Sequence, residues 1–212
     1  MRFLFATKLT GFVIVLLMAG CASGPERLSF DKEKAPLLHN AYIELNVKKP
    51  SAAFLNTGSP GTAGMPLATL MTTDTSKLSK APIQALLDRE KIDISEIVRA
   101  EAQQILSKKS SVRLTARESA KVIFRFTVES YGLSKTHPFG SVYDANVSIT
   151  ASLVTSEGKL IWQVTDWVSG LALDNKDGRT LDVYYARPET LKTALSTASR
   201  IVVKRLISNL PD

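Results

Sequence analysis

Cys21 is the single cysteine of the 212-residue chain, and its thiol is the side chain whose position points most directly to one kind of chemistry. One cysteine cannot form an internal disulfide, nor can it build the metal sites that need paired cysteines. It stands in the stretch LLMAGCASG at 16–24, where an apolar segment ends and a polar one begins. The chemistry of this thiol therefore depends on the kind of segment that ends at it.

The first twenty residues have the layout of a secretory signal. Arg2 and Lys8 supply a positive start, residues 9–17 form a short apolar run, and small residues come next to the cysteine. A helix that spans a membrane needs about 20 apolar residues, and this run is shorter. We therefore expect residues 1–20 to be a signal peptide that the mature protein lacks.

The stretch LMAGC at 17–21 resembles the lipobox of bacterial lipoproteins. In that family diacylglycerol is attached to the cysteine sulfur, the signal is cut just before the cysteine, and the new amine is acylated. Cys21 matches the modified position, whereas Met18 stands where the pattern prefers Leu, Val or Ile. The resemblance implies that Cys21 is the lipidation site and that membrane lipid is a partner of the mature protein.

The residue after the cysteine sorts such lipoproteins between the two membranes of the envelope. Aspartate there tends to hold the protein at the inner membrane, and this chain has Ala22 instead. The resemblance therefore implies an outer-membrane protein whose folded part faces the periplasm. Several acyl chains anchor a protein stably, while one chain gives only marginal binding.

The sequence holds no set of side chains that is typical of an active site. His39 and His137 lie far apart, and the G-x-S-x-G, H-E-x-x-H and P-loop motifs do not occur. Glu96 and Glu101 fall on the flank of a predicted helix, and Asp166 interrupts the apolar face of a predicted strand, where a charge discourages edge pairing. We expect no catalytic residue, no cofactor and no metal, and a protein that is not an enzyme.

The net charge of +7 includes two basic residues of the signal peptide, so the mature chain carries a smaller positive excess. This excess favours anionic partners such as lipid headgroups. It is scattered along the chain, whereas nucleic-acid-binding proteins gather their basic residues on one face. We therefore expect no nucleic-acid partner.

The mature chain divides into a tether and one domain. Residues 21–37 are rich in Gly, Pro and charge, which predicts a lipidated cysteine followed by a flexible tether. Residues 38–212 have the length of a single domain. Within it, the glycines and prolines at 54–80 predict a long loop, which either packs across the domain or binds a partner or membrane.

Alternating apolar and polar residues predict strands at 41–49, 111–115, 121–133, 144–154 and 159–169. Helical periodicity predicts helices at 81–91, 93–109 and 187–210. Asp93 is the expected N-cap of the second helix, and Pro188 fits the first turn of the third. Residues 171–186 read as a loop. The order indicates an α+β fold with a mainly antiparallel sheet of four to five strands and two main helices on one face.

The last predicted helix places its basic residues off the apolar stripe, at Lys192, Arg200, Lys204 and Arg205. Such residues usually form a solvated face, and the alternative is a contact with an anionic surface or partner. Both interpretations stay open from the sequence.

The order of elements over residues 40–170 resembles small periplasmic domains of the TolB N-terminal, CsgG-like and LpoB-like groups. This likeness is at the level of the fold and says little about activity. Our hypothesis is a lipid-anchored, non-enzymatic adaptor or accessory subunit of a cell-envelope assembly, with an envelope protein as partner. The alternatives are a lipid- or glycan-handling carrier subunit and a CsgG-like secretion component. The sequence does not indicate the oligomeric state.

Overall fold

Two long antiparallel strands organise the computed structural model, which describes residues 28–57, 81–137, 139–169, 172 and 174–211. Strand β3 (Val122–Lys135) pairs with β4 (Val142–Thr155), and β4 pairs with β5 (Leu160–Val168), also antiparallel. Gly158 closes the turn before β5 with a φ of +88°, a conformation that glycine adopts without strain. The three long strands therefore lie where the alternation of apolar and polar residues predicts them.

The α+β class is confirmed, but the sheet has six strands and is mixed. β1 (Ala41–Ile43) and β2 (Phe54–Asn56) both pair with β3 in parallel, and β6 (Arg179–Thr180) pairs with β4 in an antiparallel direction. The sequence predicted β1 as part of a longer strand at 41–49, but the prediction of a mainly antiparallel sheet of four to five strands missed β2 and β6. Strands of two or three residues are too short to show a period of two in the sequence.

Three predicted segments differ in the structure. The first strand ends at Ile43, and Leu45, expected to be buried, is 63% exposed. Residues 111–115 form only an isolated bridge, between Leu114 and Ala41. Residues 54–56 of the predicted loop form β2, which passes so close to β3 that a Cβ at Gly132 would lie 2.1 Å from the carbonyl oxygen of Phe54. The rest of that loop, 58–80, lies outside the described residues.

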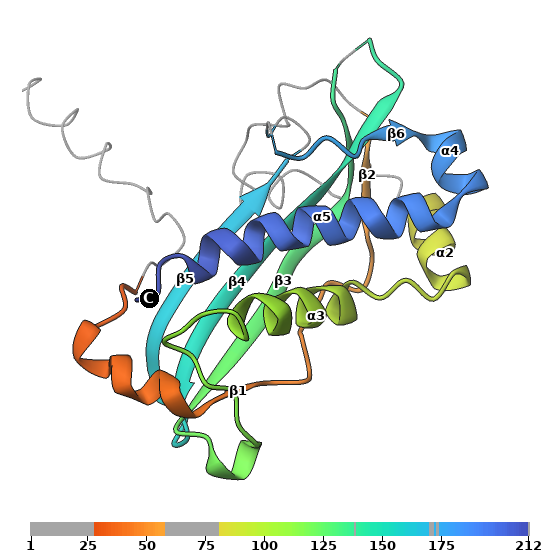
Figure 1. Ribbon diagram of the computed structural model, residues 1–212. Helices are drawn as coiled ribbons and strands as arrows, with labels where there is room; N and C mark the ends of the chain where they lie inside the picture. Colours follow the sequence, from red (N-terminus) through yellow and green to blue (C-terminus); the bar gives the residue numbers. More distant parts are fainter. Residues whose placement is uncertain (1–27, 58–80, 138, 170–171, 173, 212) are drawn as a thin grey trace, which may run out of the picture.

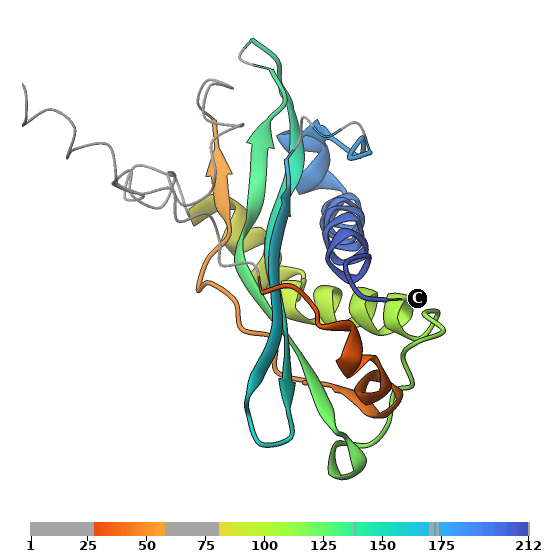
Figure 2. The same cartoon turned by 90° about the vertical axis from the view of Figure 1, so that its left-hand side faces the viewer.

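Two helices cover one face of the sheet, as Figures 1 and 2 show, and they are the two main helices that the sequence predicts. They are α3 (Ile94–Leu106), with the Asp93 carboxylate accepting the Ser95 N–H as its N-cap, and α5 (Pro188–Ile207). The other elements are α2 (Ala81–Arg89), α4 (Leu181–Ala186) and the 3₁₀ helices η2 (Lys32–Asn40) and η5 (Arg117–Ser119). The helix α4 lies where the sequence predicts a loop. None of the described helices is long and apolar enough to cross a bilayer.

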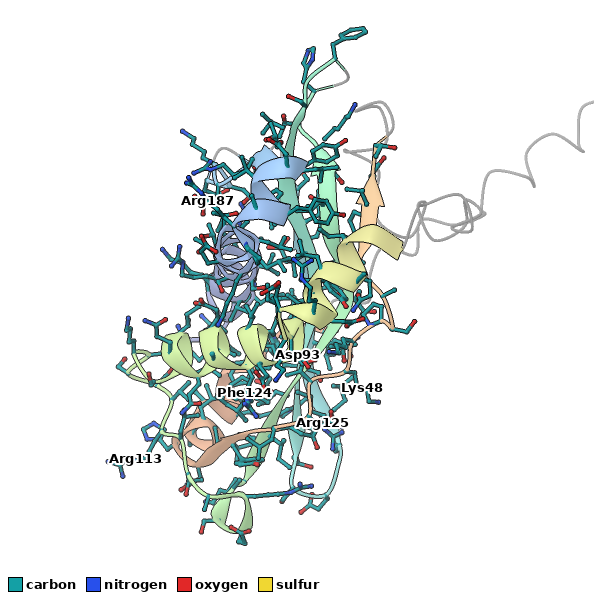
Figure 3. The ribbon with its side chains drawn as sticks, turned by 90° about the vertical axis from the view of Figure 1, so that its right-hand side faces the viewer. Lys48, Asp93, Arg113, Phe124, Arg125 and Arg187 are labelled. Atoms are coloured by element: carbon teal, nitrogen blue, oxygen red, sulfur yellow. The ribbon has the colours of Figure 1, made fainter. Side chains whose placement is uncertain are left out.

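The core lies between these helices and the sheet. Figure 3 shows Phe124 and its neighbour Arg125 on opposite sides of β3, as the pleat requires. Phe124, Ile149 and Leu153 are 0% exposed, so no space large enough for a water molecule adjoins these side chains.

The other face of the sheet is polar. Polar side chains of three neighbouring strands meet there: Thr150 Oγ1 lies 2.8 Å from Thr165 Oγ1 and donates to the Glu129 carboxylate at 2.6 Å. On the edge beyond β3, Arg125 Nε lies 2.9 Å from Glu44 Oε2. The two faces of β3 and β4 thus differ in polarity as the alternation predicts.

Truncating a core residue and, separately, its polar neighbour tests which face of the sheet is buried. We expect Leu153→Ala to lower the free energy of unfolding by about 3 kcal/mol, because it leaves a cavity in the core around a side chain that is 0% exposed. The control, Ser152→Ala, changes a half-exposed residue on the opposite face and should cost less than about 0.5 kcal/mol. Urea unfolding of both variants measures the difference, and equal costs would contradict the assignment of the faces.

Candidate functional site

The chain joins the domain at the edge of the sheet. Leu28 and Gln163 exchange two backbone hydrogen bonds, with N–O distances of 3.0 and 3.2 Å. Gln163 lies in β5, the last strand in the order β1-β3-β4-β5. Residues 28–37 belong to the segment expected to be a tether, and here they contact the domain, with η2 beginning at Lys32. Cys21 itself lies outside the described residues.

Other groups cover this edge further along β5. The Asp166 carboxylate accepts the N–H of Trp167 at 2.8 Å, and Arg205 Nη1 lies 3.5 Å from the Trp167 carbonyl oxygen. An exposed edge strand offers unpaired backbone groups to other strands, and charged side chains protect it. Asp166 thus lies on an edge strand, which agrees with the prediction that its charge discourages pairing at an edge.

A groove at the C-terminal end of α5 gathers basic residues. Its volume is about 470 Å³, and it is lined by Asp174, Arg200, Ile201, Lys204, Arg205 and Ser208. Arg205 Nη2 binds both carboxylate oxygens of Asp174, at 3.0 and 3.1 Å. The structure therefore brings together three of the four basic residues that the sequence singles out on this helix, while Lys192 lies near its other end.

Glu101 lies on α3, the helix that packs beside α5. Burial raises the pKa of its carboxyl, and the positive charge of Arg200 opposes that rise. Glu96, the other carboxylate considered from the sequence, is exposed. The described residues contain no group of three His, Cys, Asp or Glu side chains that could hold a metal ion.

The hairpin between β3 and β4 projects from the end of the sheet (Figure 1). At its tip Phe139 is 93% exposed, its N–H donates to His137 Nδ1 at 3.3 Å, and the two ring centres are 5.8 Å apart. His137 is exposed and belongs to the loop, as the sequence predicts. An exposed aromatic side chain on a projecting hairpin is suited to contact a partner, because such side chains bury much area per residue.

A buried polar cluster, missed in the sequence, fixes the segment before α4. Tyr184 Oη donates to the carbonyl oxygen of Tyr143 at 3.0 Å, and Asn175 Nδ2 donates to that of Ala145 at 2.8 Å. Asp144, beside them on β4, is 5% exposed, and a Cβ at Gly178 would lie 2.0 Å from its carboxylate. In the sequence, Gly178, within the predicted loop at 171–186, was the one residue that could have indicated this close contact.

The electrostatics of this cluster follow from burial. Burial raises the pKa of Asp144 to about 6, Asp177 adds to the rise, and Arg179 opposes it. Burial likewise raises the pKa of Tyr184 to about 12. Because no hydrogen bond to Asp144 Oδ1 is found among the described residues, its charged form lacks the partner that would offset desolvation.

Comparisons with known proteins give likenesses of fold only. No family model matches the sequence, and no curated protein matches it. Among solved structures, the PelC dodecamer of Paraburkholderia phytofirmans is 14% identical with a TM-score of 0.42, covering 81% of this chain and 87% of that one. Protein XCC0632 of Xanthomonas campestris, of the family DUF330, is 9% identical with a TM-score of 0.47, covering 79% and 81%.

A third solved structure is a lipoprotein. GNA1162 of Neisseria meningitidis is 14% identical with a TM-score of 0.22, covering 60% of this chain and 80% of that one. The identities and TM-scores of all three are too low to assign this chain to a family. The resemblance to the TolB, CsgG and LpoB groups stays a prediction.

The raised pKa of Asp144 predicts a pH-dependent stability. The folded protein keeps this proton up to about pH 6, whereas the unfolded chain loses it near 3.8, so stability falls as pH rises through that window. As the pH rises from 4 to 7, we expect the free energy of unfolding of Asp144→Asn to increase relative to that of the parent protein, by no more than about 3 kcal/mol. Urea unfolding across pH measures this gain. The exposed Asp182→Asn is the control, and a parallel pH profile for parent and Asp144→Asn would contradict the prediction.

Proposed function

We propose that the protein is a lipid-anchored lipoprotein of the outer membrane that acts as a non-enzymatic adaptor or accessory subunit in a cell-envelope assembly. The observation that carries the proposal is the short span between the acylation motif and the domain. Cys21 comes seven residues before Leu28, which is already hydrogen-bonded to β5. Seven residues reach about 25 Å at most, so acyl chains on Cys21 hold the domain close to the bilayer.

The exposed hairpin tip supports the adaptor part of the proposal. Leu28 bonds to Gln163 in β5, whereas Phe139 lies at the tip of the β3–β4 hairpin, which extends beyond the helices (Figure 2). A domain held near the membrane through β5 would present this tip to a neighbouring envelope protein. Exposed aromatic residues frequently supply much of the binding energy of such contacts.

The anchor is tested by Cys21→Ser. The serine hydroxyl cannot take the thioether-linked diacylglycerol, so we expect the variant to leave the outer-membrane fraction, with at least a tenfold loss. The intact mass should lack the acyl chains that the parent protein carries. Ser23→Ala, two residues later, is the control and should fractionate as the parent does. Equal recovery of both variants in the outer membrane would refute the anchor.

The partner contact is tested by Phe139→Ser. In-cell cross-linking followed by purification of the processed protein should lose an envelope protein that the parent protein captures. The unfolding free energy should change by less than about 0.5 kcal/mol, since the side chain is exposed. Leu45→Ser, which alters another exposed apolar residue, is the control. An unchanged set of captured proteins in the Phe139 variant would remove the hairpin from the interface.

A further inference from the structure

We propose that the basic groove at the C-terminal end of α5 binds the phosphate headgroups of anionic lipids in the same membrane that holds Cys21. The inference rests on the proposed function, because it places the groove beside an acylated anchor. It adds a second contact with the bilayer, which sets the orientation of the domain. The occupant is a lipid surface whose phosphodiester headgroups carry a net negative charge.

The side chains of the groove are suited to a phosphate. Arg205 is oriented by its two hydrogen bonds to Asp174, and it is 41% exposed. Lys204 and Arg200 are exposed, and no ion pair is found for either among the described residues. Guanidinium groups bind phosphate oxygens in a bidentate manner, and lysine acts as a compact positive charge. The groove thus offers two unpaired cations beside one that is held in place.

Stabilisation of the helix dipole does not account for the whole set. Cations in the last turn of a helix interact favourably with its negative end, which explains Lys204 and Arg205. Arg200 lies before that turn, seven residues from the end of α5 at Ile207. The carboxylate of Glu101 acts on Arg200 through its charge, but no ion pair between the two is found among the described residues, and Glu101 Oε2 has no hydrogen-bond partner there.

A second helix ends in the same region. Ser111 Oγ donates to the carbonyl oxygen of Pro211 at 2.7 Å, which joins the segment after α3 to the segment after α5. Lys108, just after α3, is exposed. Figure 1 shows the two helices side by side, with the C-terminus marked at the end of α5. The positive charge therefore continues beyond the groove along this end of the domain.

The groove borders β5, the strand to which the tether segment is hydrogen-bonded. Arg205 contacts Trp167, and Leu28 bonds to Gln163, four residues away on β5. Four residues of strand span about 13 Å, and the chain from Leu28 back to Cys21 reaches about 25 Å. An acylated Cys21 therefore keeps the groove within reach of the headgroups at all times.

The experiment uses the mature acylated protein in lipid nanodiscs, with an environment-sensitive dye on Asn209→Cys. Acylated Cys21 has no free thiol, so the new cysteine is labelled alone. We expect the dye emission to shift to the blue in discs that contain phosphatidylglycerol and not in discs of phosphatidylcholine. Reversing two charges, in Arg200→Glu/Lys204→Glu, should reduce this shift at least fivefold, because each cation near an anionic membrane adds measurably to binding.

The control variant is Lys192→Glu, which reverses an exposed charge near the other end of α5 and should keep the full shift. Thermal unfolding of the variants verifies that they fold. An equal shift in both kinds of disc, or equal losses in the groove and control variants, overturns the proposal. The proposal is also overturned if soluble polyglutamate, added to the protein in phosphatidylcholine discs, causes a shift equal to that in phosphatidylglycerol discs. That result would assign the groove to an acidic protein partner.

Failure of the groove and failure of the anchor give different results. Co-elution of the protein with the discs reports the acyl anchor in either lipid, independently of the dye. Co-elution without a lipid-dependent shift refutes the groove and leaves the anchor. Loss of co-elution from both kinds of disc refutes the lipid-anchored function on which the inference rests.

Discussion

The continuous pairing of β3 with β4 is the constraint on which the other features depend. The ladder runs from Val122 opposite Thr155 to Lys135 opposite Tyr143, with one irregularity between Val128 and Ser130. Its length gives α5 an apolar surface on one side and leaves a polar surface on the other. The same ladder accepts β1 and β2 along β3, carries β5 along β4, and extends into the hairpin that exposes Phe139. Shortening this ladder would displace the apolar face, the polar face, the β5 edge and the hairpin together.

The edge of the sheet at β5 combines protection with attachment. The backbone groups of β5 that face away from β4 are used by Leu28, by the Asp166 side chain and by Arg205. A free edge promotes pairing between copies of a protein, a particular hazard for proteins that a membrane concentrates in two dimensions. The segment that follows Cys21 occupies part of the edge that needs cover, through the hydrogen bonds of Leu28.

The sequence predicted features that repeat locally and missed those that depend on distant residues. Strand β4 alternates over its whole length, and α5 repeats its apolar residues over five turns, so both emerged with nearly correct ends. The short strands β2 and β6 exist only through their pairing with β3 and β4. Asp144 looked like any polar strand residue, because its burial comes from the segment around Gly178 and from Tyr184. Cys21 could be proposed from the sequence because its motif is continuous, whereas Asp174, which completes the lining of the groove, comes from a loop that only the fold brings to α5.

The groove need not bind lipid tightly to be effective. Tethering makes a second contact intramolecular, and a short linker gives effective concentrations in the millimolar range. A groove with millimolar affinity for headgroups would then be occupied for much of the time. This explains how Asp174 can remain in the groove: its ion pair with Arg205 weakens attraction for phosphate but fixes the guanidinium in position. Under the proposal, weak binding at a groove that borders β5 would be enough to orient the sheet relative to the bilayer, and with it the hairpin that carries Phe139.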